Sequence, residues 1–151
     1  MKSRYFSTFQ LILLALFAAL IVIAKIALKT PLQLPGHTGI FWMAILIVAS
    51  RVVPQRGAAS MVGLLSGILA SFLGLGDYGF LDTFVSYLMI GIATDLALLL
   101  LGNSENLISA AMIGALGHLG KFLVKWGIGL LTGAPLGFVT LGLLNSLIGY
   151  I

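Results

Sequence analysis

The chain has 151 residues, of which 60% are hydrophobic and 8% charged, and its mean hydropathy is +1.18. A soluble globular domain carries about a quarter charged residues, so this composition excludes that class and indicates an α-helical membrane protein. There is no cysteine, which excludes disulfides and thiolate catalysis, and the net charge of +4 comes from too few residues to form a nucleic-acid-binding face.

Six apolar segments follow one another along the chain, and a membrane span needs about 20 such residues. We expect helices at residues 8–28, 38–52, 58–73, 80–101, 106–131 and 136–151. Breaks between them fall at prolines and glycines, including Pro31, Pro35 and Pro54. The sequence therefore predicts a single domain, residues 1–151, that is an all-α integral membrane protein with a bundle of six transmembrane helices.

The basic residues near the turns predict the orientation, because cytoplasmic loops are enriched in Lys and Arg. Lys2 and Arg4 precede the first segment, and Arg51 and Arg56 flank the turn two spans later. Both pairs place the N-terminus in the cytoplasm, and six spans place the C-terminus there too. No small-residue cleavage site precedes a polar region, so we interpret the first apolar run as a retained helix rather than a signal peptide.

Several ionisable residues fall inside the apolar segments, where they are costly and usually serve a polar cavity. The spacing of His118, Lys121 and Lys125 places all three on one face of the fifth segment. At about 1.5 Å per residue, these three reach the outer half of the bundle, as do Asp82 and Lys25. We therefore expect a polar pocket in the outer half, with Asp82 as a counter-charge for Lys121 or Lys125.

Some of these residues also have simpler interpretations. Lys25 and Lys29 can be interfacial anchors whose long side chains reach the lipid headgroups, and His37 can be an ordinary loop residue. The face of three residues on the fifth segment is harder to explain in this way, because His118 lies too deep to reach water.

No catalytic or metal-binding motif accompanies these residues. Two histidines without a His-x-x-x-His or carboxylate-rich pattern do not make a metal site. Ser66 lacks the first glycine of the Gly-x-Ser-Gly pattern of rhomboid-type proteases, and Lys121 does not lie in a P-loop. We expect a protein that is not an enzyme, holds no metal or cofactor and does not hydrolyse ATP itself.

Small residues at spacings of four mark three of the segments and allow helix backbones to approach closely. They are Ala15, Ala18 and Ala19 on the first segment, Gly63, Gly67 and Ser71 on the third, and Ala110, Gly114 and Gly117 on the fifth. Most such stripes serve internal packing. The alanines of the first segment stand out because they lie on the half of the bundle that lacks polar residues.

Taken together, these features resemble the S components, the substrate-binding subunits of energy-coupling factor (ECF) transporters. The resemblance covers the whole chain and includes the six spans, the short basic N-terminus, the pair Ala15 and Ala19, and the long loop from Thr30 to Thr38. It implies that the alanines contact a transmembrane coupling subunit, that the loop closes over the ligand and that helices 4 to 6 line the site. Lys2 replaces the histidine expected of nickel and cobalt members, which argues against a metal substrate.

The function implied by this resemblance is capture of a vitamin or vitamin precursor from outside a prokaryotic plasma membrane. The partners are then the membrane lipid, the coupling subunit and two cytoplasmic ATPases, with no nucleic acid. Lys121 and Lys125, together with Lys25, would attract an anionic group, and Trp126, Tyr78, Trp42 or Tyr87 could stack on a ring. The expected substrate-binding residues are Lys25, His37, Tyr78, Asp82, Tyr87, His118, Lys121, Lys125 and Asn145. The expected partner-docking residues are Ala15, Ala18 and Ala19.

Two other classes of function stay open at this point. One is a small oligomeric channel or secondary carrier, in which the Lys, His and Asp residues form an ion or proton path. The other is an assembly subunit that transports nothing. Adjacency of the gene to genes for ATPases and a coupling subunit would favour the first interpretation over both.

Overall fold

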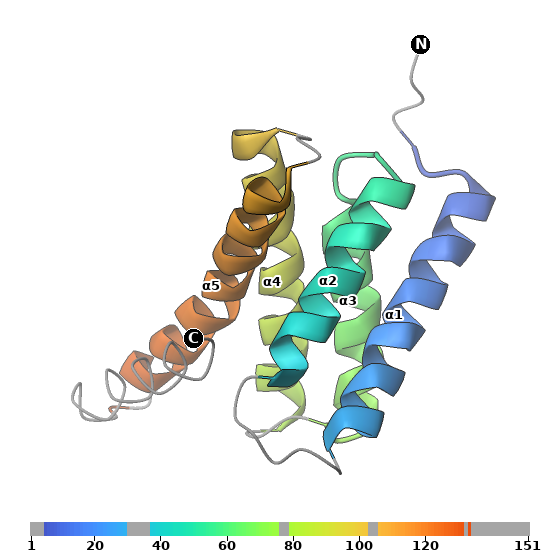
Figure 1. Cartoon of the computed structure of the whole chain (residues 1–151). Helices are drawn as coiled ribbons and strands as arrows, with labels where there is room; N and C mark the ends of the chain where they lie inside the picture. The colour runs from blue at the N-terminus through green and yellow to red at the C-terminus, as the bar shows by residue number, and fades with distance from the viewer. Residues whose placement is uncertain (1–4, 30–36, 76–78, 103–105, 132, 134–151) are drawn as a thin grey trace.

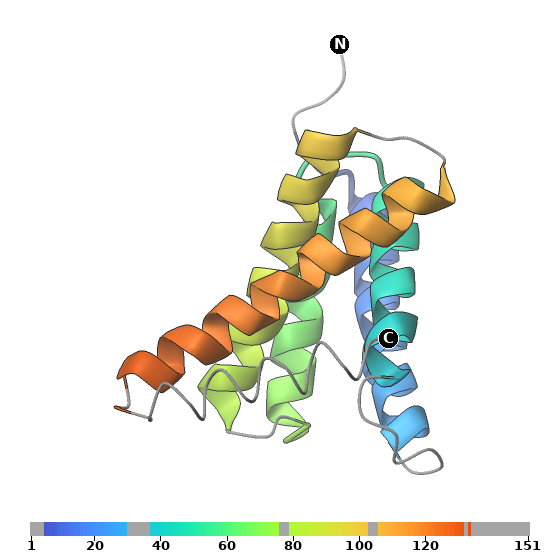
Figure 2. The ribbon, with the colours of Figure 1, turned by 60° about the vertical axis from the view of Figure 1, so that its left-hand side comes forward.

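Five helices run alternately in opposite directions in the computed structural model (Figure 1). The structure describes residues 5–29, 37–75, 79–102, 106–131 and 133. The regular secondary structure of these residues is all α-helix: α1 (Thr8–Lys29), α2 (His37–Val52), α3 (Ala58–Phe72), α4 (Phe80–Leu101) and α5 (Leu107–Leu131). The last helix, α5, crosses α4 obliquely, and its C-terminal end lies away from α1 and α2 (Figure 2).

The five described helices match the predicted ones to within one residue at each end. His37 was expected in the loop before this helix, but it is the first residue of α2. The sixth predicted helix, residues 136–151, lies outside the described residues, as do residues 30–36 of the loop after α1. Three helices, α1, α4 and α5, are long and apolar enough to cross a membrane, whereas the apolar helices α2 and α3 are shorter. The described part of the chain is therefore an all-helical fold with three helices that are able to span a membrane.

The start of α1 is set by a reciprocal pair of hydrogen bonds. Ser7 Oγ accepts a hydrogen bond from the Gln10 backbone N–H at 3.3 Å, and Gln10 Oε1 accepts one from the Ser7 backbone N–H at 2.9 Å. This arrangement is a capping box, which satisfies two N–H groups that have no partner within the helix.

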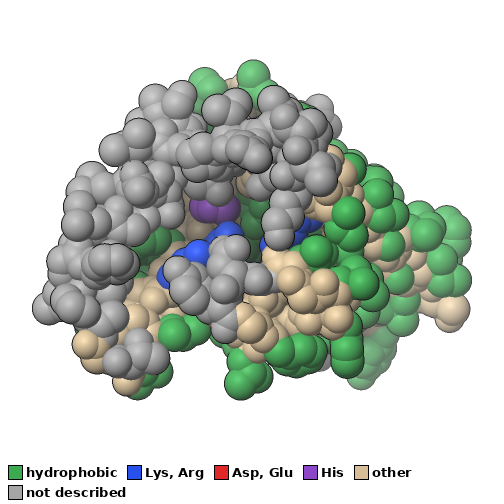
Figure 3. Space-filling model, turned by 90° about the horizontal axis from the view of Figure 1, so that it is seen from below, with side chains coloured by type: hydrophobic (Ala, Val, Ile, Leu, Met, Phe, Trp, Pro, Cys, Tyr) green, Lys and Arg blue, Asp and Glu red, His purple; other side chains and the backbone are tan. Residues whose placement is uncertain are grey.

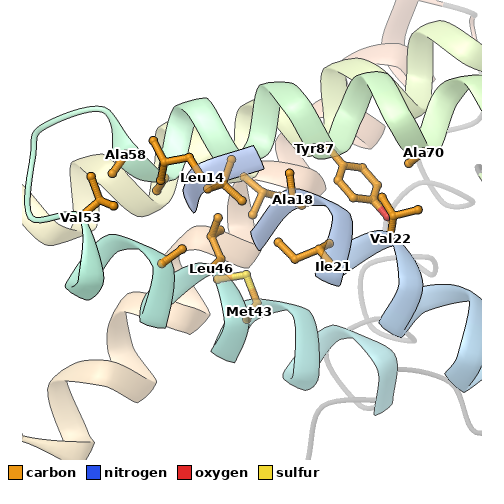
Figure 4. Close-up of a cluster of buried hydrophobic side chains, with 14 residues drawn as sticks. Leu14, Ala18, Ile21, Val22, Met43, Leu46, Val53, Ala58, Ala70 and Tyr87 are labelled. Carbon is orange, nitrogen blue, oxygen red and sulfur yellow. The ribbon is translucent and has the colours of Figure 1, made fainter. Parts of the chain in front are cut away.

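The apolar core lies between α1, α2, α3 and α4. Leu14, Ala18 and Ile21 of α1 meet Met43 and Leu46 of α2 (Figure 4), and all five are nearly inaccessible to solvent. These α1 positions recur every three or four residues, so they form one face of the helix. The opposite face of α1 is exposed and apolar, as expected for a helix that contacts lipid.

Glycines let α3 and α4 approach until their backbones touch. A Cβ atom at Gly91 would lie 2.5 Å from the Ala59 carbonyl oxygen, and one at Gly63 would lie 2.6 Å from the Tyr87 carbonyl oxygen. Neither position has room for a side chain. The predicted stripe on α3 is therefore an internal packing surface, and its third member, Ser71, is also buried.

Glycines on α5 likewise allow a close approach of α5 to α4. A Cβ at Gly120 would lie 2.6 Å from the Met89 carbonyl oxygen, and one at Gly117 would collide with Thr94 Oγ1. These contacts set the alignment of the two antiparallel helices. Residues after Gly120 on α5 therefore run alongside residues before Met89 on α4.

Candidate functional site

The basic residues of α1 and α5 occur where these two helices end and where α2 and α4 begin (Figure 1). We call this region the lysine end and define it by Lys25, Trp42, Tyr87, His118, Lys121 and Lys125. Seen along the bundle from this end, Lys or Arg side chains and a His side chain are visible near one another (Figure 3). Arg51 and Arg56 belong to the opposite end, near the turn between α2 and α3.

Four helices contribute to a column of side chains at the lysine end. The rings of Trp42 and Tyr87 are stacked, with centroids 5.4 Å apart and an interplanar angle of 22°. Lys25 Nζ lies 5.1 Å from the centroid of the Tyr87 ring, which is a cation–π distance. On the other side, the His118 ring lies 6.1 Å from the Trp42 ring at an angle of 60°. The column thus joins α1, α4, α2 and α5 in that order.

The position of Tyr87 follows from the glycines of α3. Its Cβ would lie 3.1 Å from a Cβ at Gly67, and its carbonyl oxygen is the group that approaches Gly63. Because α3 presents only hydrogen atoms there, α4 comes close and Tyr87 is held with 7% of its surface exposed. The glycine stripe that packs α3 on α4 therefore also fixes the central ring of the column.

The charge at the lysine end is positive. Lys25, Lys121 and Lys125 are all half-buried, and both lysines of α5 act electrostatically on His118. Asp82 lies in the first turn of α4 and is half-buried too. Pairing of the Asp82 carboxylate with Lys121 or Lys125 stays a prediction. Three half-buried lysines in surroundings of low polarity favour the binding of an anion.

Five of the nine expected substrate-binding residues come together in this way. They are Lys25, Tyr87, His118, Lys121 and Lys125. His37 begins α2 at the same end, but its side chain lies outside the described residues, as do Tyr78 and Asn145. Contact of these residues with a ligand stays a prediction.

The alanines proposed for docking divide into two groups. Ala15 is exposed and Ala19 is half-buried, so both reach the outer face of α1. Ala18 is fully buried within the core. Its assignment as a docking residue is therefore wrong, because a residue one position before Ala19 turns about 100° around the helix and faces α2 and α3.

A second polar region, at the opposite end, escaped the sequence analysis. The Asp95 carboxylate of α4 accepts hydrogen bonds from the backbone N–H groups of Ala59 at 3.3 Å and Ser60 at 2.8 Å. It borders a cavity of about 170 Å³, which Ser50, Gln55, Arg56 and Leu98 also line. An aspartate inside an apolar segment was the sequence feature that pointed to this region. Its partner could not be predicted, because it is the N-terminus of another helix.

Comparison of the chain with models of protein families, with curated proteins and with solved structures gives no match. Function is therefore argued from the lysine end itself.

Proposed function

We propose that this chain is a membrane-embedded substrate-binding subunit of an importer, of the type of an ECF S component. The observation that carries the proposal is the column from Lys25 through Tyr87 and Trp42 to His118, flanked by Lys121 and Lys125. Half-buried cations beside aromatic faces suit a small molecule that has both a flat apolar part and a negative charge. A vitamin or vitamin precursor with an anionic group has this character.

The proposal includes an arrangement in the membrane. Six helices cross a prokaryotic plasma membrane, with both termini in the cytoplasm and the lysine end facing outward. Arg51 and Arg56 then lie on the cytoplasmic side, as the enrichment of basic residues in cytoplasmic loops requires. The sixth helix, residues 136–151, completes the bundle and brings Asn145 to the site.

The partners in the proposal are a transmembrane coupling subunit and two cytoplasmic ATPases. The coupling subunit docks on the exposed face of α1 through Ala15 and Ala19, where small side chains allow a close approach of helices. ATP hydrolysis by the partners drives the transport step, since this chain carries no P-loop.

The packing of the described bundle argues against the alternative of a channel or carrier with a Lys, His and Asp path. Beyond the lysine end, the space between α1, α2 and α3 is filled by Leu14, Leu46, Val53, Ala59 and Val62, each at most 1% exposed. An ion would have to cross this apolar core, which is costly without polar partners. This packing favours a binding site at the lysine end over a continuous polar path through the described bundle.

The proposal is tested with the full chain, tagged and purified from its native host in mild detergent. We expect it to co-purify with ATPase and coupling subunits and to release a small anionic molecule on denaturation, identified by mass spectrometry. Reconstituted with these partners, it should catalyse ATP-dependent uptake of that molecule. Absence of both associations, or ion conductance by the chain alone in liposomes, would overturn the proposal.

A further inference from the structure

Six serine and threonine side chains are buried among the described residues, and five of them share one kind of partner. Each of the five donates a hydrogen bond to a backbone carbonyl. The pairs are Ser50 with Leu46 at 2.9 Å, Ser66 with Val62 at 2.7 Å, Ser71 with Phe80 at 3.1 Å, Thr83 with Gly79 at 2.7 Å and Thr94 with Ile90 at 2.8 Å. Such bonds satisfy a hydroxyl inside an apolar bundle.

Ser86 is the sixth and differs from the others. Its side chain is 3% exposed, and its Oγ has no hydrogen-bond partner among the described residues. A carbonyl is within easy reach in principle, because Asp82 lies four residues earlier in the same helix. The Ser86 hydroxyl makes no such hydrogen bond. A buried polar group without a partner is unfavourable and calls for an explanation in terms of function.

The place of Ser86 supplies that explanation. It precedes Tyr87, whose ring stands between Lys25 and Trp42 in the column. It also lies one turn before Met89, which packs on Gly120 of α5. Since the helices are antiparallel, this is the level at which Lys125 follows Gly120. Ser86 therefore lies at the same level of the bundle as Tyr87 and the basic part of α5.

We propose that Ser86 is a ligand-binding residue that selects a planar heteroaromatic acid. The Ser86 hydroxyl donates a hydrogen bond to an acceptor atom in the ring, the Trp42 and Tyr87 rings contact the flat face, and the lysines hold the carboxylate or phosphate. Every polar group at this site that we assign to the ligand is a donor, which suits a ligand rich in acceptors. The inference rests on the proposed function, because it assigns a ligand to the same site.

The test uses the full chain with Trp126→Phe, so that Trp42 is the remaining tryptophan and its fluorescence reports binding. Three probes separate the features of the ligand: pyridine-3-carboxylate has a planar ring with an acceptor, benzoate has a planar ring without one, and cyclohexanecarboxylate has neither. We expect affinity to fall in that order. Ser86→Ala should bind pyridine-3-carboxylate about tenfold more weakly, as for loss of one hydrogen bond, and no better than benzoate.

Ser66→Ala is the matched control, since its hydroxyl is buried but bonded within α3. It should leave the order of the three affinities unchanged. Thermal unfolding without a probe supplies a second measurement. Ser86→Ala should be at least as stable as the parent because no hydrogen bond is lost, and Ser66→Ala should be less stable. Lower stability of Ser86→Ala would reveal an internal partner and overturn the proposal.

The remaining outcomes are also decisive. If Ser86→Ala binds pyridine-3-carboxylate with unchanged affinity, the Ser86 hydroxyl does not bind the ligand. If cyclohexanecarboxylate binds as tightly as pyridine-3-carboxylate, the site does not select a planar ring. If none of the three probes binds, the proposed class of ligand is wrong. The proposed function is tested separately, by co-purification with ATPase and coupling subunits and by ATP-dependent uptake.

Discussion

Asp95 of α4 caps the N-terminus of α3 through Ser60, a residue 35 positions earlier in the chain. The carboxylate accepts the Ser60 backbone N–H at 2.8 Å and the Ser60 hydroxyl at 2.5 Å. The residue at the N-cap position of α3 is Gly57, which has no side chain to perform this task. A charge that would be costly inside an apolar bundle is thus stabilised by the free N–H groups and dipole of a neighbouring helix.

Replacing Asp95 should therefore loosen the contact between α3 and α4. We expect Asp95→Ala to lower the free energy of unfolding by about 1 to 3 kcal/mol, because it leaves partly buried N–H groups without a charged acceptor. Thermal or denaturant unfolding in detergent measures the change. Asp82→Ala is the control, since the Asp82 carboxylate has no described partner to lose, and equal destabilisation by both variants would contradict the capping role.

The close approach at Gly91 gives a prediction about backbone packing. Gly91→Ala should destabilise the protein by about 1 to 3 kcal/mol, because its methyl group would collide with the Ala59 carbonyl and force the helices apart. Gly127→Ala provides the comparison on α5, where a Cβ meets no atom within 4 Å. It should be neutral or stabilising by up to about 1 kcal/mol, from helix propensity alone. Melting temperatures of the two variants in the same detergent test the contrast, and a stable Gly91→Ala variant would refute the packing.

The two lysines of α5 carry a prediction about ligand affinity. Lys121→Ala or Lys125→Ala should weaken binding of a co-purifying anion by about 1 to 3 kcal/mol, the range for losing a hydrogen bond to a charged group. Calorimetry on purified variants measures the effect. Arg56→Ala removes the same charge from the opposite end and should bind normally. Wild-type affinity in both single variants and in the double variant would rule out the anion site.

The faces of α1 predict different outcomes for two nearby alanines. Ala15→Trp should abolish uptake while leaving ligand binding intact, because a bulky group on the exposed face blocks close approach of a partner helix. Ala18→Trp should instead disrupt folding, since its methyl group is fully buried. Uptake assays in cells and binding to purified protein separate the two effects.

Ala111→Trp on the exposed face of α5 controls for a bulky substitution at a surface position and should leave uptake unchanged. If Ala15→Trp transports normally, this face of α1 contacts lipid. If it loses ligand binding as well, the position contributes to the fold rather than to docking.

The sequence by itself determined the helices. Long apolar runs broken by prolines and glycines place the ends of α1 to α5 to within one residue, because local hydropathy and turn residues decide where a membrane helix begins and ends. The spacing of His118, Lys121 and Lys125 also predicted a shared face, since periodicity along one helix is a local property. The resemblance to S components rests on such local features and on nothing in the packing.

Only the tertiary structure decided which residues meet. The partner of Asp95 is a helix start 35 residues away, and the column joins residues from four helices. The spacing of small residues along α1 also could not distinguish the buried Ala18 from the exposed Ala15. These relationships depend on the rotation and alignment of each helix against its neighbours. Glycine contacts such as those of Gly63, Gly91 and Gly120 set that alignment, because close packing of backbones permits few positions for one helix against another.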